Sequence, residues 1–156
     1  MVRSSSDILS LTHAWFGTFH KMDTMEKLPY DFGTGDLINR SEIHMIGAIG
    51  THNDINVTDL AELLEVSKSA ISQMIRKLSE KDLVEKYRDP ENDKEVLLRL
   101  TPRGKIAYHG HEQYHARYDA QMLKNIGPLT DEEFDIIKRF IDAVDITADA
   151  SLEKKI

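Results

Sequence analysis

Hydrophobic residues near the start of the chain recur at intervals of three and four, which is the spacing of one face of an α-helix. This pattern predicts a helix over about residues 7–26. Its apolar stripe consists of Ile8, Leu11, Trp15, Phe19 and Met22. A second helix is predicted to begin with Ser41 as its N-cap, because serine side chains accept hydrogen bonds at helix starts, and to end at 52–54.

Two short helices are predicted next, over 58–64 and 67–78, with Ser67 as the N-cap of the second. The inner face of this second helix carries Ile71, Met74, Ile75 and Leu78. Only Glu65 and Val66 separate the two short helices. That spacing favours a tight helix–turn–helix over a hairpin of long helices.

Two β-type runs, 83–88 and 95–100, flank a turn-rich stretch at 89–94 and predict a β-hairpin with a charged tip. Past the hairpin, a helix opens at Pro102 and runs to about residue 125, since proline is favoured at the first helical position. A last helix, opened by a capping box of Thr130 and Glu133, fades near residue 150. The predicted fold class is therefore mostly α with a small β-hairpin wing (α+β).

The chain of 156 residues carries 20 Lys and Arg against 27 Asp and Glu. This net charge of −7 disfavours nucleic-acid binding by the chain as a whole. The charge is unevenly distributed, however. Residues 68–105 hold ten basic and seven acidic residues, a net charge of +3, which leaves −10 for the rest. A charge run is usually a solvated surface, but this one coincides with the predicted helix–turn–helix and hairpin.

The composition excludes several classes of protein. The chain has no cysteine, which rules out disulfide frameworks, thiol catalysis and cysteine-ligated metal centres. Its apolar stretches fall far short of the roughly 20 residues that cross a bilayer, and its start lacks the apolar core of a secretion signal. We therefore expect no membrane partner and a cytoplasmic location.

The outward positions of the second short helix carry side chains that suit the major groove of DNA. They are Lys68, Ser69, Ser72, Gln73 and Arg76. Glutamine can pair with adenine and arginine with guanine, while hydroxyls and lysine bind phosphates or bases. The hairpin adds Arg88 and Lys94. The alternative is a solvent-facing helix beside a hairpin, but the order of turn, polar face and basic hairpin favours double-stranded DNA as the partner.

One pattern extends over this whole region. It consists of LAELLEVSKSAIS at 60–72, IRKL at 75–78, Leu83-Val84, Asp89, Asp93-Lys94 and LTPRG at 100–104. The pattern resembles the MarR family of winged helix–turn–helix transcription regulators, and the flanking long helices extend the resemblance over essentially the whole chain. Glu65 replaces a glycine common in the turn, so the turn avoids positive φ there or bears strain. Lys94 replaces the usual arginine of the wing and lacks its planar fork.

The resemblance implies a homodimer that is formed by terminal helices and reads pseudo-palindromic DNA. The apolar stripes of the first and last helices agree with this, because they exceed what a small winged domain can cover. We expect dimerisation segments in 1–36 and 102–156 and a winged helix–turn–helix DNA-binding domain in 37–101. The expected function is a sequence-specific transcription regulator acting as a ligand- or metal-responsive repressor.

Residues 111–115 read H-E-Q-Y-H and match the zinc-peptidase pattern H-E-x-x-H. No further ligand motif follows, and patterns this short arise readily by chance. We therefore expect that the chain is not an enzyme, with a zinc metallopeptidase as the alternative. A second alternative is a winged-helix protein-interaction module that does not bind DNA.

The resemblance also suggests a regulatory metal site. Some MarR-like zinc-responsive repressors have a glutamate on the first helix, one histidine on the second and two on the fifth. The corresponding residues here are Glu26, His44, His111 and His115. Three imidazoles and a carboxylate suit tetrahedral zinc, although the cysteine-assisted second site of those repressors is absent. No cofactor is required, and zinc is a candidate effector; alternatively, these histidines pack between helices with hydrogen bonds to neighbouring groups.

An organic molecule is the other candidate effector. The residues predicted to line its crevice are Trp15, Phe16, Phe19, Tyr114 and Tyr118. MarR-like proteins often bind small aromatic acids in such a place, although an aromatic stripe is more often simply core. Either ligand would act by changing the spacing between two recognition helices.

Overall fold

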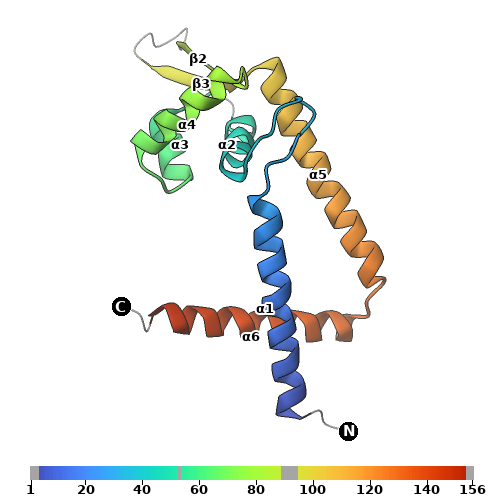
Figure 1. The fold of residues 1–156 in the computed structure, drawn as a ribbon. Coiled ribbons are helices and arrows are strands. Elements are labelled where there is room, and N and C mark those ends of the chain that lie inside the picture. Colours follow the sequence, from blue (N-terminus) through green and yellow to red (C-terminus); the bar gives the residue numbers. More distant parts are fainter. Residues whose placement is uncertain (1–3, 53, 89–94, 154–156) are drawn as a thin grey trace. The chain divides into compact units, whose positions relative to one another are not determined.

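The computed structural model describes residues 4–52, 54–88 and 95–153, which form helices and one small sheet (Figure 1). The helices are α1 (Ser5–Lys27), α2 (Arg40–Thr51), α3 (Val57–Leu63), α4 (Lys68–Glu80), α5 (Pro102–Ile126) and α6 (Asp131–Glu153). The strands are β1 (Ile55–Asn56), β2 (Val84–Arg88) and β3 (Val96–Leu100). The predicted fold class and order of elements are confirmed, and β1 is an addition.

The chain divides into two compact units. Unit 2 comprises residues 23–117 and holds the sheet together with α2, α3 and α4. Unit 1 comprises residues 1–22 and 118–156 and holds α6. The long helices α1 and α5 contribute residues to both units.

Unit 2 is built around a three-stranded antiparallel sheet in the order β1–β3–β2. Strands β2 and β3 form the predicted hairpin, in which Val84 lies opposite Leu100. The tip of the hairpin, residues 89–94, lies outside the described residues. Strand β1 pairs Ile55 with Leu98 and has only two residues, which is too short to give an alternating pattern in the sequence.

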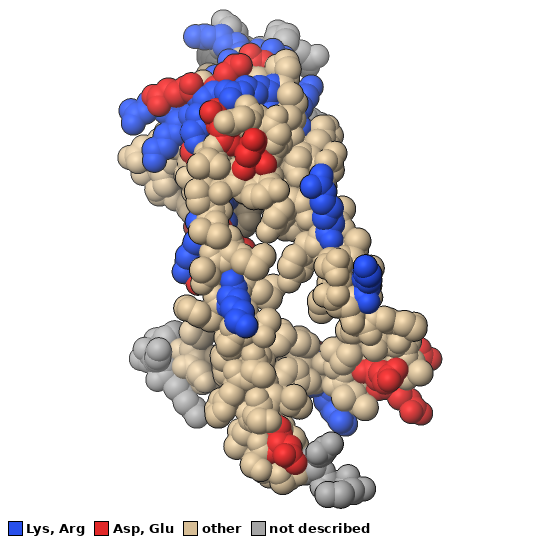
Figure 2. All heavy atoms as spheres, turned by 45° about the vertical axis from the view of Figure 1, so that its right-hand side comes forward, with Lys and Arg blue, Asp and Glu red and all other residues tan. Residues whose placement is uncertain are grey.

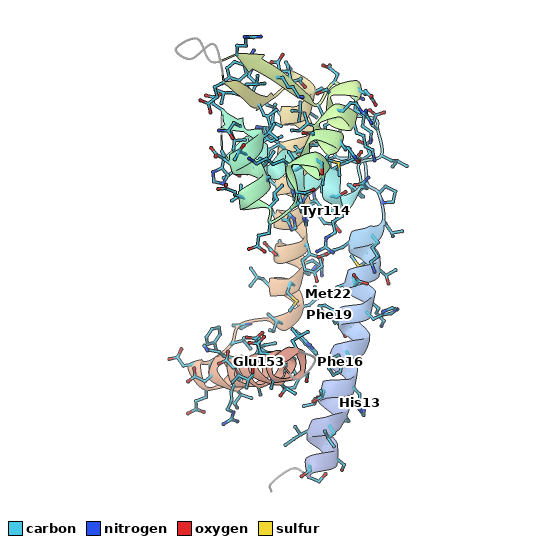
Figure 3. The ribbon with its side chains drawn as sticks, turned by 90° about the vertical axis from the view of Figure 1, so that its left-hand side faces the viewer. His13, Phe16, Phe19, Met22, Tyr114 and Glu153 are labelled. Atoms are coloured by element: carbon cyan, nitrogen blue, oxygen red, sulfur yellow. The ribbon has the colours of Figure 1, made fainter. Side chains whose placement is uncertain are left out.

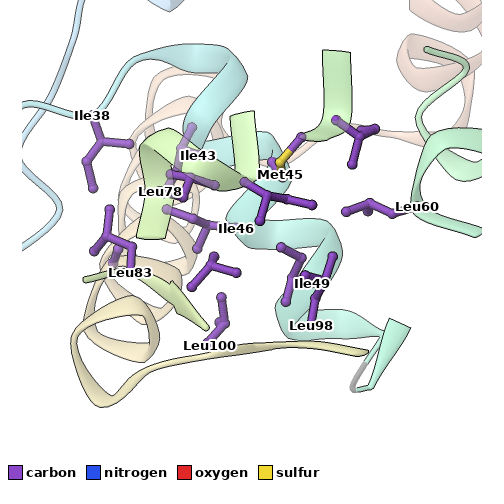
Figure 4. Packing of buried hydrophobic residues seen from close by; sticks show 14 of the residues in the cluster. Ile38, Ile43, Met45, Ile46, Ile49, Leu60, Leu78, Leu83, Leu98 and Leu100 are labelled. Atoms are coloured by element: carbon purple, nitrogen blue, oxygen red, sulfur yellow. The ribbon is translucent and has the colours of Figure 1, made fainter. Parts of the chain in front are cut away.

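The core of unit 2 is formed by side chains from the helices and the sheet together (Figure 4). The largest fully buried side chains are Ile38, Ile46, Ile49, Leu60, Ile71, Ile75, Leu78, Leu83, Val84 and Leu98. Full burial of an aliphatic side chain stabilises the folded state by about 1.5–3 kcal/mol. Because α4 contributes three of these residues, the core fixes which face of α4 points inward.

The turn between α3 and α4 is closed by backbone hydrogen bonds, with Glu65 in the left-handed conformation (φ 54°). The N–H of Val66 donates to the carbonyl oxygen of Ala61 over 3.0 Å, and that of Glu65 donates to Glu62 over 3.2 Å. This is the Schellman arrangement that glycine usually completes. The chain therefore makes the turn with positive φ at a glutamate, at a cost of about 1–2 kcal/mol relative to a relaxed backbone.

The structure shows which polar residues are the N-caps of α2 and α4. The prediction that Ser41 caps α2 is wrong, because Asn39 is the N-cap and shares a capping box with Glu42. This reciprocal pair satisfies two backbone N–H groups, while the Ser41 hydroxyl donates to the Asn39 side chain over 2.8 Å. Ser67 caps α4, as predicted, and accepts a hydrogen bond from the N–H of Ala70.

Unit 1 is held by contacts between α1 and α6. Trp15 and Phe140 meet edge to face with ring centroids 6.1 Å apart. The predicted capping box at the start of α6 is confirmed, because the N–H of Thr130 donates to Glu133 over 2.8 Å and the N–H of Glu133 donates back over 3.3 Å. Neither α1 nor α6 contains a buried residue. Among the described residues, no helix is both long and apolar enough to span a membrane.

Gly104 gives a test of the packing between α5 and the start of the hairpin. A Cβ added there would lie 1.9 Å from the carbonyl oxygen of Leu83. We expect Gly104→Ala to lower the free energy of unfolding, measured by urea titration, by about 1–3 kcal/mol. The control is Gly47→Ala in α2, where nothing lies within 4 Å of the added Cβ; it should raise stability by about 0.5–1 kcal/mol. Similar effects of the two substitutions on the free energy of unfolding would contradict the close approach of Gly104 to the Leu83 carbonyl.

Candidate nucleic-acid interface and ligand cavity

The outer face of α4 carries the polar side chains predicted to contact DNA. All five are exposed: Lys68, Ser69, Ser72, Gln73 and Arg76. The buried residues of the same helix are Ile71, Ile75 and Leu78. With 3.6 residues per turn, burial of this apolar stripe leaves the polar stripe on the surface. The structure therefore brings the five predicted side chains to one accessible face.

The charges at this face leave it open to an anionic partner. Arg76 Nε lies 3.9 Å from Glu80 Oε1, and 73% and 69% of the two side chains are exposed. Such pairs contribute only a few tenths of a kcal/mol, so a phosphate or a base can compete with Glu80. The first turn of α4 contains no acidic residue, and the positive end of its dipole adds to the attraction for phosphate.

The wing presents Arg88 at the exposed end of β2, while Lys94 lies outside the described residues. Arg99 of β3 is engaged within the sheet. Its Nε donates to Glu85 over 2.8 Å, and its guanidinium lies 4.6 Å from the ring centre of Tyr87. These contacts hold β2 and β3 together and so support the position of Arg88.

The basic stretch 68–105 includes cations whose charge is neutralised inside unit 2. The Lys81 ammonium lies 2.9 Å from each carboxylate oxygen of Glu42, and the Arg103 guanidinium lies 2.7 Å from Asp36. Figure 2 shows Lys and Arg side chains gathered over the end of unit 2 that carries the sheet, with Asp and Glu side chains among them. These internal ion pairs therefore neutralise part of the net positive charge that the sequence gives to residues 68–105.

A cavity of about 190 Å³ lies within unit 2. It is lined by Met25, Glu26, Leu28, Tyr30, Phe32, Ile38, Arg40, Ile43, His44, His111, Tyr114 and His115. The four residues predicted as metal ligands are all in this lining. The structure therefore brings the predicted set, which comes from α1, α2 and α5, to one cavity.

The four side chains are close to one another but are not arranged as a coordination shell. Nε2 of His111 and Nε2 of His115 are 2.9 Å apart, whereas the ring centroids of His44 and His111 are 6.2 Å apart. The carboxylate of Glu26 lies 2.7 Å from Arg40. Within the described ranges, no three His, Asp or Glu side chains are placed together as a metal ion needs. To bind a metal, Glu26 would have to exchange Arg40 for the ion.

The cavity lowers the pKa of two of its histidines. The pKa of His111 falls because burial removes hydration, and because His115 and His44 lie nearby. The pKa of His44 falls chiefly through loss of hydration and then through Arg40, while Glu26 acts in the opposite direction. Both imidazoles are therefore neutral near pH 7, which is the form that binds a metal.

The H-E-x-x-H match does not form a peptidase site. Glu112 lies 2.9 Å from Nδ1 of His109, and more than half of each side chain is exposed. A peptidase needs this glutamate to act as a base on a water bound to the metal. Its partner here is instead a surface histidine.

Tyr114 is the one predicted effector residue that belongs to unit 2. It lines the cavity, with its ring centroid 5.3 Å from that of Tyr30 and 6.1 Å from that of Phe32. The other predicted residues belong to unit 1: Trp15, Phe16, Phe19 and Tyr118. A crevice built from the whole set stays a prediction.

The loop before α2 contributes cavity residues that were not predicted from the sequence, among them Tyr30 and Phe32. Tyr30 and Ile38 exchange two backbone hydrogen bonds of 3.0 Å each, and this closes a loop in which Phe32 is buried. One oxygen of Asp31 accepts hydrogen bonds from three successive N–H groups in the loop. The run D-F-G-T-G at 31–35 was the available signal, since a carboxylate followed by glycines favours a tight turn.

The fold and the exposed face of α4 define a winged helix–turn–helix protein. Residues 38–96 match the model of the MarR family. The HTH-type transcriptional regulator YhjH of Bacillus subtilis is 32% identical over 111 residues, which cover 71% of this chain and 63% of YhjH. The chain thus spans less than two thirds of the length of this relative.

Two solved structures share the fold. Streptococcus pneumoniae FabT in complex with DNA has a TM-score of 0.66 at 19% identity, with 91% of this chain and 97% of that chain covered. The zinc-responsive MarR family member ZitR of Lactococcus lactis has a TM-score of 0.67 at 19% identity, with 88% and 96% covered. Residues 38–96 thus match the MarR family, as the sequence pattern predicts, and the chain is similar to transcriptional regulators with a helix–turn–helix. This is a family of regulators and not of enzymes.

The lowered pKa of His111 predicts how stability depends on pH in the metal-free protein. Between the folded-state pKa and the ordinary value of about 6.5, the unfolded chain binds more protons than the folded chain. The folded state therefore loses no stability through His111 above about pH 6.5. As the pH drops below that value, the free energy of unfolding decreases. We expect the Tm, measured in EDTA from pH 7.5 to 5.5, to fall less steeply for His111→Asn than for the wild type. Parallel curves would contradict the assignment.

Proposed function

We propose that this chain is a homodimeric repressor that binds pseudo-palindromic operators in double-stranded DNA, in the cytoplasm. The observation that carries the proposal is the polar face of α4, held outward by the burial of its opposite side. In a helix–turn–helix, the second helix enters the major groove and its outward side chains reach the bases. A dimer bound in this way covers promoter DNA and excludes other proteins from it.

The side chains of α4 fall into two roles. Gln73 offers a donor and an acceptor that suit adenine, Arg76 offers two donors that suit guanine, and both side chains are exposed. Lys68, Ser69 and Ser72 lie nearer to the start of the helix, where backbone N–H groups also favour phosphate. The wing adds Arg88 and Lys94 as backbone contacts.

The apolar surface of unit 1 supports the proposal of a homodimer. Long helices with no buried residue, such as α1 and α6, are marginal in water unless a partner covers their apolar side. Phe16, Phe19 and Met22 lie along α1 with 59%, 60% and 41% of their surface exposed (Figure 3). A second copy provides the same apolar helices, and in a twofold dimer the two recognition helices reach half-sites related by the same symmetry.

Arg76→Ala tests base reading by α4. We expect it to weaken binding to a duplex that the wild type selects from a random pool by about 1–3 kcal/mol, with little effect on an unselected duplex. Lys94→Ala should weaken binding to both duplexes and reduce the salt slope by about one unit. Lys105→Ala, which removes one exposed cation from α5, is the control for charge alone. Equal losses on both duplexes for Arg76→Ala would contradict base reading, and failure of the wild type to enrich any duplex would contradict the function.

Zinc is the effector that we propose for the cavity. The support is that Glu26, His44, His111 and His115 line one cavity, that two of the imidazoles are held neutral, and that ZitR, a structure of the same fold, is described as zinc-responsive. When bound there, zinc would be held by these side chains. It would regulate DNA binding to the extent that it favours one spacing of the recognition helices.

Zinc binding can be tested on the untagged protein. At a free zinc concentration of about 100 times its Kd, stability should rise by about 2.7 kcal/mol, and affinity for the selected duplex should change. His111→Ala should lose both responses. His109→Ala removes an exposed histidine two positions away and should keep them. Equal stabilisation of wild type and His111→Ala would place the zinc elsewhere and reject this site.

A further inference from the structure

The C-terminal end of α4 is tied to the body of unit 2 by Lys81, which is the C-cap of that helix. Its Nζ lies 2.9 Å from each carboxylate oxygen of Glu42 and 3.3 Å from the carbonyl oxygen of Leu37. An ammonium group has three N–H donors, and these three acceptors engage all of them. Only 4% of the Glu42 side chain is exposed, so its charge depends on Lys81 for compensation.

Arg103, in the first turn of α5, binds the same end of α4. Its Nη1 donates to the carbonyl oxygen of Lys81 over 2.7 Å. Its Nη2 donates to the carbonyl oxygen of Thr34 over 2.9 Å and to the carboxylate of Asp36 over 2.7 Å. One guanidinium thus joins α5, the loop before α2 and the C-cap residue of α4. We call Asp36, Glu42, Lys81 and Arg103 the clamp.

The clamp acts on a helix end that is already well ordered. The N–H of Leu83 donates to the carbonyl oxygen of Leu78 over 2.9 Å, and that of Asp82 donates to Ser79 over 3.0 Å. These bonds fix the backbone that follows α4, with Asp82 at a positive φ of 55°. A cation at a helix C-terminus is also favoured by the helix dipole. Arg103 binds this ordered backbone through the carbonyl oxygen of Lys81.

We propose that Arg103 is a positioning residue for DNA recognition: it sets the orientation of α4 through Lys81, Thr34 and Asp36 and does not bind phosphate. This inference rests on the proposed function of α4 as the DNA-reading helix. Arg103 and Lys81 belong to the basic stretch 68–105 that also contains the cations proposed to contact DNA. Their hydrogen bonds show a different role, because their N–H donors are directed at acceptors inside unit 2.

The charge-conserving variant Arg103→Lys distinguishes the two roles. Lysine keeps the charge but cannot span three acceptors with a planar fork. Positioning predicts about tenfold weaker binding to the selected duplex, with unchanged binding to an unselected duplex and an unchanged salt slope. A phosphate contact made by charge alone would survive the substitution. Wild-type affinity of Arg103→Lys for the selected duplex, or equal losses on both duplexes, overturns the proposal.

Asp36→Asn gives a second test in which the two roles predict opposite signs. The matched control is Glu62→Gln, which removes an equal charge from an exposed position of α3. Loss of negative charge alone strengthens binding to DNA in both variants. Positioning predicts weaker binding to the selected duplex for Asp36→Asn only. Equal or tighter binding by both variants overturns the proposal.

Hydrogen exchange without DNA separates failure of this inference from failure of the proposed function. In Arg103→Lys, the N–H groups of Lys81, Asp82 and Leu83 should exchange faster than in the wild type, while those of α6 should not. Unchanged exchange at these three positions overturns the clamp, whether or not DNA binds. If the wild type binds no duplex, the proposed function fails. The exchange rates still show whether Arg103 holds the backbone that follows α4. Thermal unfolding shows whether each variant is folded. If Arg103→Lys does not fold, the same measurements are made on Asp36→Asn.

Discussion

Burial of one side of α4 is the constraint on which the rest of the interface depends. Ile71, Ile75 and Leu78 are completely removed from water, and each contributes about 1.5–3 kcal/mol to folding. Rotation of α4 about its axis would expose these side chains, so the polar stripe is held outward by the same free energy. Packing of the core therefore determines which residues of α4 face outward. The interactions of these outward residues with the rest of the protein are few and weak.

One stretch of chain, residues 30–44, connects the cavity with the end of α4. Phe32 and His44 line the cavity, while Asp36 and Glu42 belong to the clamp. The capping box and the closed loop make this stretch stiff, so its two sets of contacts are not independent. A ligand in the cavity would affect α4 through this stretch if it bound two positions of the stretch with different affinity.

Local pattern predicted most of the fold, and long-range pairing explains why the clamp was missed. The helices, the hairpin and the cap at Ser67 follow from spacing within about a dozen residues. Asn39 and Ser41 are equally good caps by residue type, but only Asn39 has a glutamate three positions later, so the capping-box pattern that decides between them was already present in the sequence. The exposed face of α4 was predictable for the same local reason. The clamp was not, because Lys81 and Arg103 pair with carboxylates 39 and 67 positions earlier in the chain, and charge order along a sequence does not identify such partners.

Thiol protection tests the central claim most directly, because the chain contains no cysteine and each introduced thiol is unique. The measurement is the rate of maleimide labelling of Ser72→Cys, on α4, and of Gln113→Cys, on α5, with and without a saturating selected duplex. Both positions are exposed in the free protein. If α4 lies in the major groove, the duplex slows labelling at residue 72 and leaves residue 113 unchanged. Unchanged labelling at residue 72 in the bound complex would contradict the account.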